Sequence, residues 1–260
     1  MWSFQRKTLT IWKRIGETPL VALGRLRQEQ PHLADEKLSY AGRLDPMAEG
    51  KLLVLVGDMC RQRERYLGLD KTYEVRILFG IESDTGDVLG IVKNQPGELS
   101  GRLIDKKEVV EGLRSFVGDI SLPYPAYSSK TVDGKPLFEW ALEGRLGDIE
   151  IPKRQSHIYS ARVKRVHTLD RATLLHYVQE KIACLPHVEE VGKELGRDFR
   201  RADVLASWEE AIAVGPGAYS IADIVVRCSS GTYMRTLAVH LGKQLKTSAL
   251  ALAITRTKIG

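Results

Sequence analysis

The sequence predicts an α+β protein with a mixed, mainly antiparallel sheet flanked by helices. Segments in which apolar and polar residues alternate, typical of half-buried strands, recur between amphipathic helical segments, without the regular strand-helix-strand order of a parallel sheet. Hydrophobic residues make up 43% and charged residues 28% of the chain, so a buried core is expected and disorder is excluded as the main state. No internal repeat or linker divides the 260 residues, which predicts one domain over residues 1–260.

The first half of the chain is expected to begin with a strand and a helix. Leu9–Trp12 alternates in polarity, and Thr18 followed by Pro19 is typical of a helix N-terminus, so a helix is expected to run to about Gln28. Ser39–Gly50 is expected to be a tight loop, because it contains an aspartate before a proline and two glycines. The next expected elements are an apolar strand at Leu52–Val56, a charged helix at Met59–Leu67, an alternating strand at Tyr73–Phe79, and a helix through Phe116 begun by the capping box of Asp105 and Glu108.

The second half of the chain is expected to carry a helical insertion between strands. Arg171–Ala213 is rich in Glu and Lys and is typical of two or three helices, flanked by strands at His157–His167 and Ala218–Cys228. Leucines at spacings of four within Gly231–Leu245 predict an amphipathic helix. Ahead of these elements we expect a strand at Ala126–Val132, a turn at Asp133-Gly134, and a short helix beginning near Pro136.

The excess positive charge is concentrated near the end of the chain. Lys and Arg number 39 against 33 Asp and Glu, a net charge of +6, and Ile224–Gly260 contains basic residues and no acidic one. A one-sided basic segment favours a polyanionic partner, either nucleic acid or an anionic membrane surface, although a solvated basic face without a partner explains the charge equally well.

Apolar run lengths and cysteine usage bear on the compartment. The longest apolar run, Leu52–Val56, is far shorter than the roughly 20 residues of a membrane span, and three scattered cysteines exclude a disulfide framework. These features predict a cytoplasmic protein with no membrane partner.

Sequence signatures of the common cofactor and hydrolase sites are missing. The chain contains no phosphate-binding G-x-x-x-x-G-K-[ST], no dinucleotide G-x-G-x-x-G, no H-E-x-x-H and no G-x-S-x-G, and its histidines lack metal-ligand spacing. We therefore expect no metal and no nucleotide cofactor. The single D-T-G at Asp84–Gly86 is better explained as a loop after the preceding strand than as an aspartic protease motif, which needs two copies of the carboxylate.

Asp45 allows two interpretations. It could cap a helix that begins with Pro46, an interaction worth about 1 kcal/mol, or it could be a catalytic carboxylate in the loop. From the residues alone, the helix cap is the simpler interpretation.

Three segments together resemble the TruB family of pseudouridine synthases: GRLDPMAEGKLLVLVG (42–57), KTYEVRILFGIESDTGDVLG (71–90) and VRCSSGTYMRTLAVHLG (226–242). Supporting matches are KRIGETPL (13–20), YPAYSSKTVDGKPLFEWALEG (124–144) and SALALAITRTKIG (248–260), so the resemblance covers residues 13–166 and 217–260. It implies the pseudouridine synthase fold and the conversion of the T-loop uridine of tRNA, U55, to pseudouridine without a cofactor.

The resemblance assigns the catalytic roles to three residues. Asp45 corresponds to the catalytic aspartate, Tyr73 to the tyrosine that packs on the target base, and Arg235 to the arginine that pairs with the aspartate. The chemistry agrees with these roles, because a buried nucleophilic carboxylate needs a cation to keep it ionised and a flipped uracil needs a flat side chain to hold it. The structural alternatives are a core position for the tyrosine and a surface salt bridge or phosphate contact for the arginine.

The RNA-binding candidates depart from the family pattern in places. The candidates are Tyr40, Arg43, Lys13, Tyr233 and Lys243. Tyr40 stands where the family usually has a histidine, and Ser230 stands where a lysine is common, which weakens the expected RNA contacts more than the chemistry. Lys13, with Gly16, belongs to a family motif whose role is mostly structural support of the site.

The length of the chain adds two further expectations. The last family motif ends at Gly260, so the resemblance predicts that the C-terminal PUA-type RNA-binding domain of many relatives is absent. The predicted insertion at 171–213 would then either replace that domain or serve in packing.

We expect a monomer that binds the T-arm of tRNA. Two alternatives stay open: a synthase that modifies another RNA, and a non-catalytic RNA-binding protein or tRNA-folding chaperone with the same fold.

Overall fold

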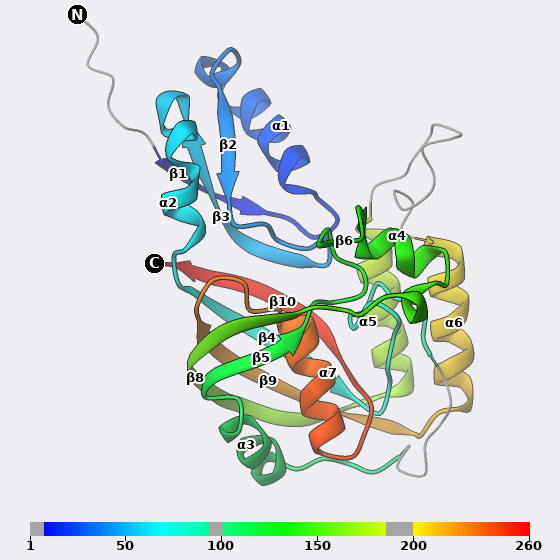
Figure 1. Ribbon diagram of the computed structural model, residues 1–260. Helices are drawn as coiled ribbons and strands as arrows, with labels where there is room; N and C mark the ends of the chain where they lie inside the picture. The colour runs from blue at the N-terminus through cyan, green and yellow to red at the C-terminus, as the bar shows by residue number, and fades with distance from the viewer. Residues whose placement is uncertain (1–7, 94–100, 186–199) are drawn as a thin grey trace, which may run out of the picture.

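An eight-stranded sheet forms the centre of the computed structural model, which describes residues 8–93, 101–185 and 200–260 (Figure 1). The strands follow the order β1-β3-β10-β4-β9-β8-β5, and β2 pairs with β3 outside this path. All pairs in the sheet are antiparallel except β10 with β3, which run parallel over Ala48–Gly50. Helices flank the sheet, so the predicted mixed, mainly antiparallel α+β fold is confirmed.

The bounds of the elements are as follows. The strands are β1 (Thr8–Lys13), β2 (Leu38–Ala41), β3 (Ala48–Val56), β4 (Lys71–Phe79), β5 (Gly118–Pro123), β8 (Lys153–Asp170), β9 (Ala218–Cys228) and β10 (Ala249–Ile259), with β6 (Thr131–Val132) and β7 (Lys135–Pro136) as a separate hairpin. The α-helices are α1 (Pro19–Glu29), α2 (Arg63–Leu67), α3 (Lys106–Arg114), α4 (Leu137–Leu142), α5 (Arg171–Ala183), α6 (Arg201–Val214) and α7 (Met234–Gln244). Three short 3₁₀ helices are η1 (Pro31–Leu33), η2 (Gly57–Gln62) and η3 (Leu146–Asp148).

Local capping explains where two predicted helices begin. The Thr18 side chain accepts a hydrogen bond from the Val21 N–H and starts α1, with a proline in its first turn. The capping box at the start of α3 is complete, since Asp105 accepts from the Glu108 N–H at 2.9 Å and Glu108 accepts from the Asp105 N–H at 3.0 Å. Both helix starts are therefore confirmed by their cap bonds.

Two groups of helices complete one continuous core on the sheet. Helix α7 lies in front of the sheet and buries Leu237 and Leu241 completely (Figure 1). Helices α5 and α6 pack on each other at one side and add Val178 and Trp208 to the same core. Residues 171–213, predicted to be helical, form these two helices, while residues 186–199 of that stretch lie outside the described residues.

Strand β2 lies in the first part of the Ser39–Gly50 segment, where a loop was expected, and β3 begins at Ala48, before the predicted strand at 52–56. Strand β10 is not predicted, because it is buried and alternating Ala and Leu carry no strand-like polarity pattern. The expected strand at Ala126–Val132 is wrong except for its last two residues, because the Ser128 and Lys130 carbonyls bond the first N–H groups of α4 instead of a neighbouring strand.

Among residues 8–93, 101–185 and 200–260, no helix is both long and apolar enough to cross a bilayer.

Candidate active site

Asp45 lies in a short loop between β2 and β3. The Ala48 N–H donates to the Asp45 carbonyl at 3.0 Å, which closes a β-turn, and β3 begins directly after it. No helix begins at Pro46, so the helix-cap interpretation of Asp45 is wrong. The turn leaves the Asp45 carboxylate, 29% exposed, available for contacts outside its own loop.

Arg235, in the first turn of α7, holds this carboxylate. Its Nε donates to Asp45 Oδ2 at 2.8 Å, its Nη1 to the Thr85 carbonyl at 2.8 Å, and its Nη2 to the Tyr127 carbonyl at 3.1 Å. The side chain is only 4% exposed, so the interpretation as a surface salt bridge is wrong. A guanidinium bonded on three sides cannot rotate freely, and its direction fixes the orientation of the Asp45 carboxylate.

A second carboxylate, that of Asp87, lies 3.5 Å from the Arg235 Nε. Its Oδ1 accepts from the Leu89 N–H and the Thr85 hydroxyl, each at 2.9 Å. Burial raises the pKa of Asp87 to about 6, although the arginine opposes this shift. Sequence reasoning missed this residue because it interpreted the D-T-G loop as a turn, and the available signal was the aspartate that directly follows that motif.

Lys13 supports the Asp45 loop from inside the protein. Its ammonium donates to the Ala48 carbonyl at 2.6 Å and to the Arg14 carbonyl at 2.9 Å, and the residue is fully buried. Burial lowers the pKa of Lys13 to about 8. A fully buried side chain cannot contact RNA, so the prediction that Lys13 binds RNA is wrong. Lys13 instead supports the Asp45 loop.

Arg256, on β10, supports the same loop from its other side. It is 1% exposed and donates from Nη2 to the Gly42 carbonyl at 3.0 Å and from Nε to the Lys51 carbonyl at 2.7 Å. A Cβ on Gly50, whose φ is +115°, would lie 2.4 Å from the Arg256 carbonyl oxygen, so β3 and β10 approach closely only with glycine there. The sequence contains no pattern that marks Arg256.

Tyr73, on β4, packs against the main core near this loop and is paired in the sheet with Arg256. Burial raises the pKa of its phenol, and the charge of Asp45 acts in the same direction. Tyr73 therefore keeps its proton at neutral pH beside the carboxylate.

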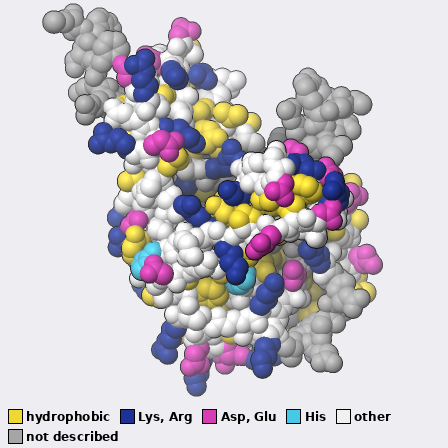
Figure 2. All heavy atoms as spheres, viewed as in Figure 1, with side chains coloured by type: hydrophobic (Ala, Val, Ile, Leu, Met, Phe, Trp, Pro, Cys, Tyr) yellow, Lys and Arg dark blue, Asp and Glu magenta, His cyan; other side chains and the backbone are white. Residues whose placement is uncertain are grey.

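A cavity of about 160 Å³ lies beside Asp45, and Tyr73, Lys13 and Arg256 are not among the residues that line it. Its lining includes the charged side chains of Asp45, Asp87, Arg200 and Arg235 and the rings of Tyr127 and Phe138. Figure 2 shows hydrophobic side chains with lysines and arginines beside them across the middle of this face, where α4 lies. A lining that combines apolar and charged side chains suits the binding of a flat polar ring.

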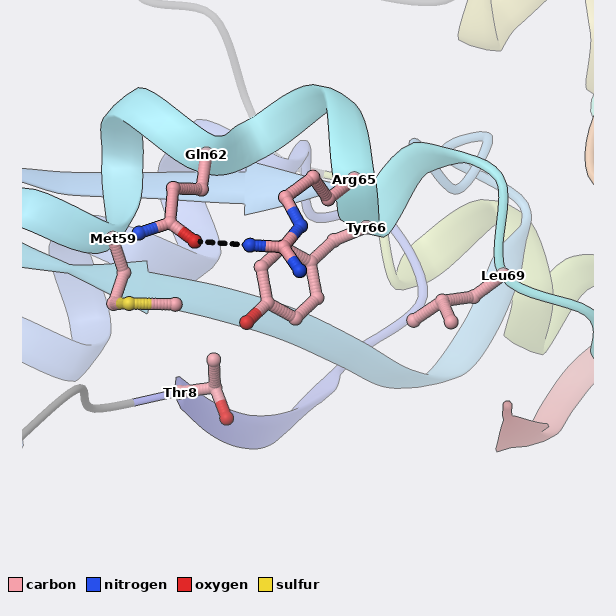
Figure 3. A pocket seen from close by; sticks show the side chains of 6 residues that line it. All are labelled: Thr8, Met59, Gln62, Arg65, Tyr66 and Leu69. Atoms are coloured by element: carbon pink, nitrogen blue, oxygen red, sulfur yellow. Dashed lines mark hydrogen bonds between the residues drawn. The ribbon is translucent and has the colours of Figure 1, made fainter.

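A larger hollow of about 290 Å³ lies elsewhere, between β1 and α2 (Figure 3). In it, Arg65 donates to the Gln62 amide oxygen at 3.1 Å, and the other lining side chains include Thr8, Met59 and Tyr66. No carboxylate lines it, so it offers no nucleophile of the kind found at Asp45. Within residues 8–93, 101–185 and 200–260, no group of three or more His, Cys, Asp or Glu side chains could hold a metal ion.

The remaining RNA-binding candidates lie in different places. Arg43 is exposed and donates to the Ser129 hydroxyl at 2.7 Å, and the Tyr233 ring meets the Tyr124 ring edge-on at 5.5 Å. Burial raises the pKa of Tyr233, and the charge of Asp45 acts in the same direction.

The other two candidates, Tyr40 and Lys243, do not line the cavity. The Tyr40 ring packs against a hydrophobic cluster that includes Leu23 and Leu26 of α1, and the Arg63 guanidinium carbon lies 5.9 Å from the ring centre. Lys243 is exposed and lies about 12 Å along α7 from Arg235.

Comparison with known proteins gives one family. Residues 30–184 match the family model described as TruB family pseudouridylate synthase (N terminal domain). The chain is 30% identical over 224 residues to a tRNA pseudouridine synthase B from Caldicellulosiruptor saccharolyticus, covering 86% of this chain and 58% of that protein. It is also 30% identical over 253 residues to the protein of the same name from Bordetella avium, covering 97% of this chain and 80% of that protein. The chain therefore spans less than two thirds of the first relative's length.

A more distant likeness is found among solved structures. A chain in the crystal structure of a Cbf5-Nop10-Gar1 complex matches with a TM-score of 0.55 at 16% identity, covering 97% of this chain and 48% of that chain. A likeness at this identity shows the fold alone.

Proposed function

The chain belongs to the TruB family of pseudouridylate synthases, and from this premise we propose that it converts a uridine of tRNA to pseudouridine with Asp45 as the nucleophile. The observation that carries the proposal is the 2.8 Å ion pair between Asp45 and Arg235, which joins two motifs 190 positions apart in the lining of one cavity. RNA binding alone would give no reason to keep a carboxylate facing a phosphate-rich ligand.

The reaction requires little beyond these side chains. It breaks the C1′–N1 bond, turns the uracil and forms a C1′–C5 bond, while a proton lost from C5 is matched by one gained at N1. Asp45 attacks either the ribose C1′ or the base C6, and Arg235, bonded to it at 2.8 Å, holds the carboxylate in place for this attack. Tyr73 would stack on the detached base and keep it in place while it turns.

The target uridine must leave its stack to reach this cavity, at a cost of a few kcal/mol. We propose that exposed Arg43 and half-buried Tyr233 contact the RNA around the flipped nucleotide, where a cation and an aromatic ring can hold phosphate and base. The motifs that resemble the family support the T-loop uridine U55 as the target and the T-arm as the bound element. The names of the relatives support tRNA as the substrate class.

The test is to incubate unmodified tRNA with the wild type and with Asp45→Asn and to map pseudouridine by chemical probing. The wild type is expected to form it in the T-loop, and Asp45→Asn to form none. Asp58→Asn, at an aspartate whose side chain is 77% exposed, is the matched control and should behave as the wild type.

Three results would change the proposal. No pseudouridine in any RNA offered would leave a binding protein or folding chaperone as the function. Pseudouridine outside the T-loop would change the target alone. Full activity of Asp45→Asn would refute the assignment of Asp45 as the nucleophile.

A further inference from the structure

Helix α6 is hydrogen-bonded to the loop that carries Asp87. This loop, residues 84–92, follows β4, and α6 comes from the stretch predicted to be an insertion. Helix α6 makes two bonds to the loop: Trp208 Nε1 donates to the Val88 carbonyl at 3.1 Å, and the Ser207 hydroxyl accepts from the Val92 N–H at 3.1 Å. Arg200, directly before α6, adds an ion pair in which its Nη1 donates to Asp84 Oδ2 at 2.5 Å. Because Trp208 is also fully buried in the core, α6 holds the loop at a fixed position.

Arg200, the residue before α6, makes the contact nearest the cavity. Its Nη2 also donates to Asp84 Oδ1 at 3.2 Å, and its guanidinium carbon lies 4.7 Å from the centre of the Tyr127 ring. The side chains of Arg200 and Asp84 are 22% and 15% exposed. Arg200 has a left-handed φ of 51°, a conformation that is uncommon for residues other than glycine.

The partners of Arg200 belong to the two segments that hold Arg235. One is Asp84, whose neighbour Thr85 gives its carbonyl to Arg235 Nη1, and the other is Tyr127, whose carbonyl accepts from Arg235 Nη2. Arg200 thus ties together the two backbone segments that aim the arginine at Asp45, and it lines the same cavity.

We propose that Arg200 is a positioning residue for the Asp45–Arg235 pair, placed there by helix α6. The inference rests on the proposed function, since it assigns a role in that reaction. It adds a residue outside the span 30–184 that matches the family model. Without the Arg200 guanidinium, the Asp84 carboxylate loses this ion pair and the Tyr127 ring loses its cation–π contact, so the carbonyls that hold Arg235 are free to shift.

The experiment measures binding and chemistry separately on unmodified tRNA. We expect Arg200→Gln to lower the single-turnover rate of pseudouridine formation by about 10- to 100-fold, as a misplacement of about 1 Å does. The Kd for tRNA, measured in an Asp45→Asn background, should change by less than about 3-fold, because a positioning residue acts on the rate and not on affinity.

Two further variants separate positioning from general stability. The double variant Asp84→Asn with Arg200→Gln removes both charges and should be no slower than Arg200→Gln alone, because both residues act through one ion pair. It also keeps the test available should the unpaired carboxylate of the single variant prevent folding. Arg171→Ala is the matched control, since exposed Arg171 bonds the Ala213 carbonyl at the far end of α6 and does not line the cavity; it should keep the wild-type rate.

Four results would overturn the inference. The first is a wild-type rate in Arg200→Gln. The second is a loss of tRNA affinity in Arg200→Gln as large as its loss of rate, which would make Arg200 an RNA contact. The third is a loss of rate in Arg171→Ala equal to that in Arg200→Gln. The fourth is a wild type that forms no pseudouridine in any RNA, in which case the proposed function itself fails and the role of Arg200 fails with it.

Discussion

Replacing Asp87 with asparagine tests the buried charges around Arg235 through the pH dependence of stability. Burial raises the pKa of Asp87 to about 6 from 3.8, so between these values the folded protein binds a proton that the unfolded chain has released. The free energy of unfolding therefore falls as the pH rises through this range. Between pH 4 and pH 7 this one group lowers it by about 2 to 3 kcal/mol.

Asparagine keeps the shape of the side chain and cannot ionise, so Asp87→Asn should lack this loss. Urea unfolding of the two proteins at several pH values between 4 and 7 measures the difference in their free energies of unfolding, in which the other titrating groups cancel. The difference should change by about 2 to 3 kcal/mol in favour of the variant as the pH rises. Asp58→Asn, at an exposed carboxylate, should run parallel to the wild type. If the free energy of unfolding of Asp87→Asn also ran parallel to that of the wild type, the raised pKa of Asp87 would be refuted.

Three other substitutions test the support of the site. Arg235→Lys keeps a positive charge but cannot make all three bonds of the guanidinium, and the single-turnover rate should fall about 100-fold with an unchanged circular dichroism spectrum; an unchanged rate would show that charge alone suffices. Lys13→Met leaves the Ala48 carbonyl without its ammonium partner and should lower the free energy of unfolding in urea by about 1–3 kcal/mol, whereas wild-type stability would contradict the supporting role. Gly50→Ala should lower the melting temperature, because its Cβ would lie 2.4 Å from the β10 backbone. Its control, Gly24→Ala, lies in open space on α1 and should raise the free energy of unfolding by about 1 kcal/mol. Equal melting temperatures of Gly50→Ala and the wild type would rule out the close approach.

Local patterns of polarity predicted the fold class, and the resemblance to the TruB family predicted the pairing of Asp45 with Arg235. Alternation in β4 marks a strand, and the motifs around Asp45 and Arg235 are specific when they occur together. Asp87 and Arg256 were not predicted, since their roles depend on burial and on backbone carbonyls brought together by distant strands, which a linear pattern does not encode. The cap at Asp45 was wrong because an Asp-Pro pair is also typical of a β-turn: Pro46 and Met47 are the middle residues of a turn, and β3 begins after it at Ala48.

The place of β10 in the sheet has a consequence for how the protein reaches its folded state. This strand lies between β3 and β4, although Ala249 follows Phe79, the last residue of β4, by 170 positions. During synthesis the two earlier strands leave the ribosome with their neighbouring edges unpaired, and the sheet closes only when the much later segment arrives between them. Contacts of such long sequence separation slow folding, so the loop that carries Asp45, bonded to Arg256 of β10, should become ordered among the last parts of the newly made chain.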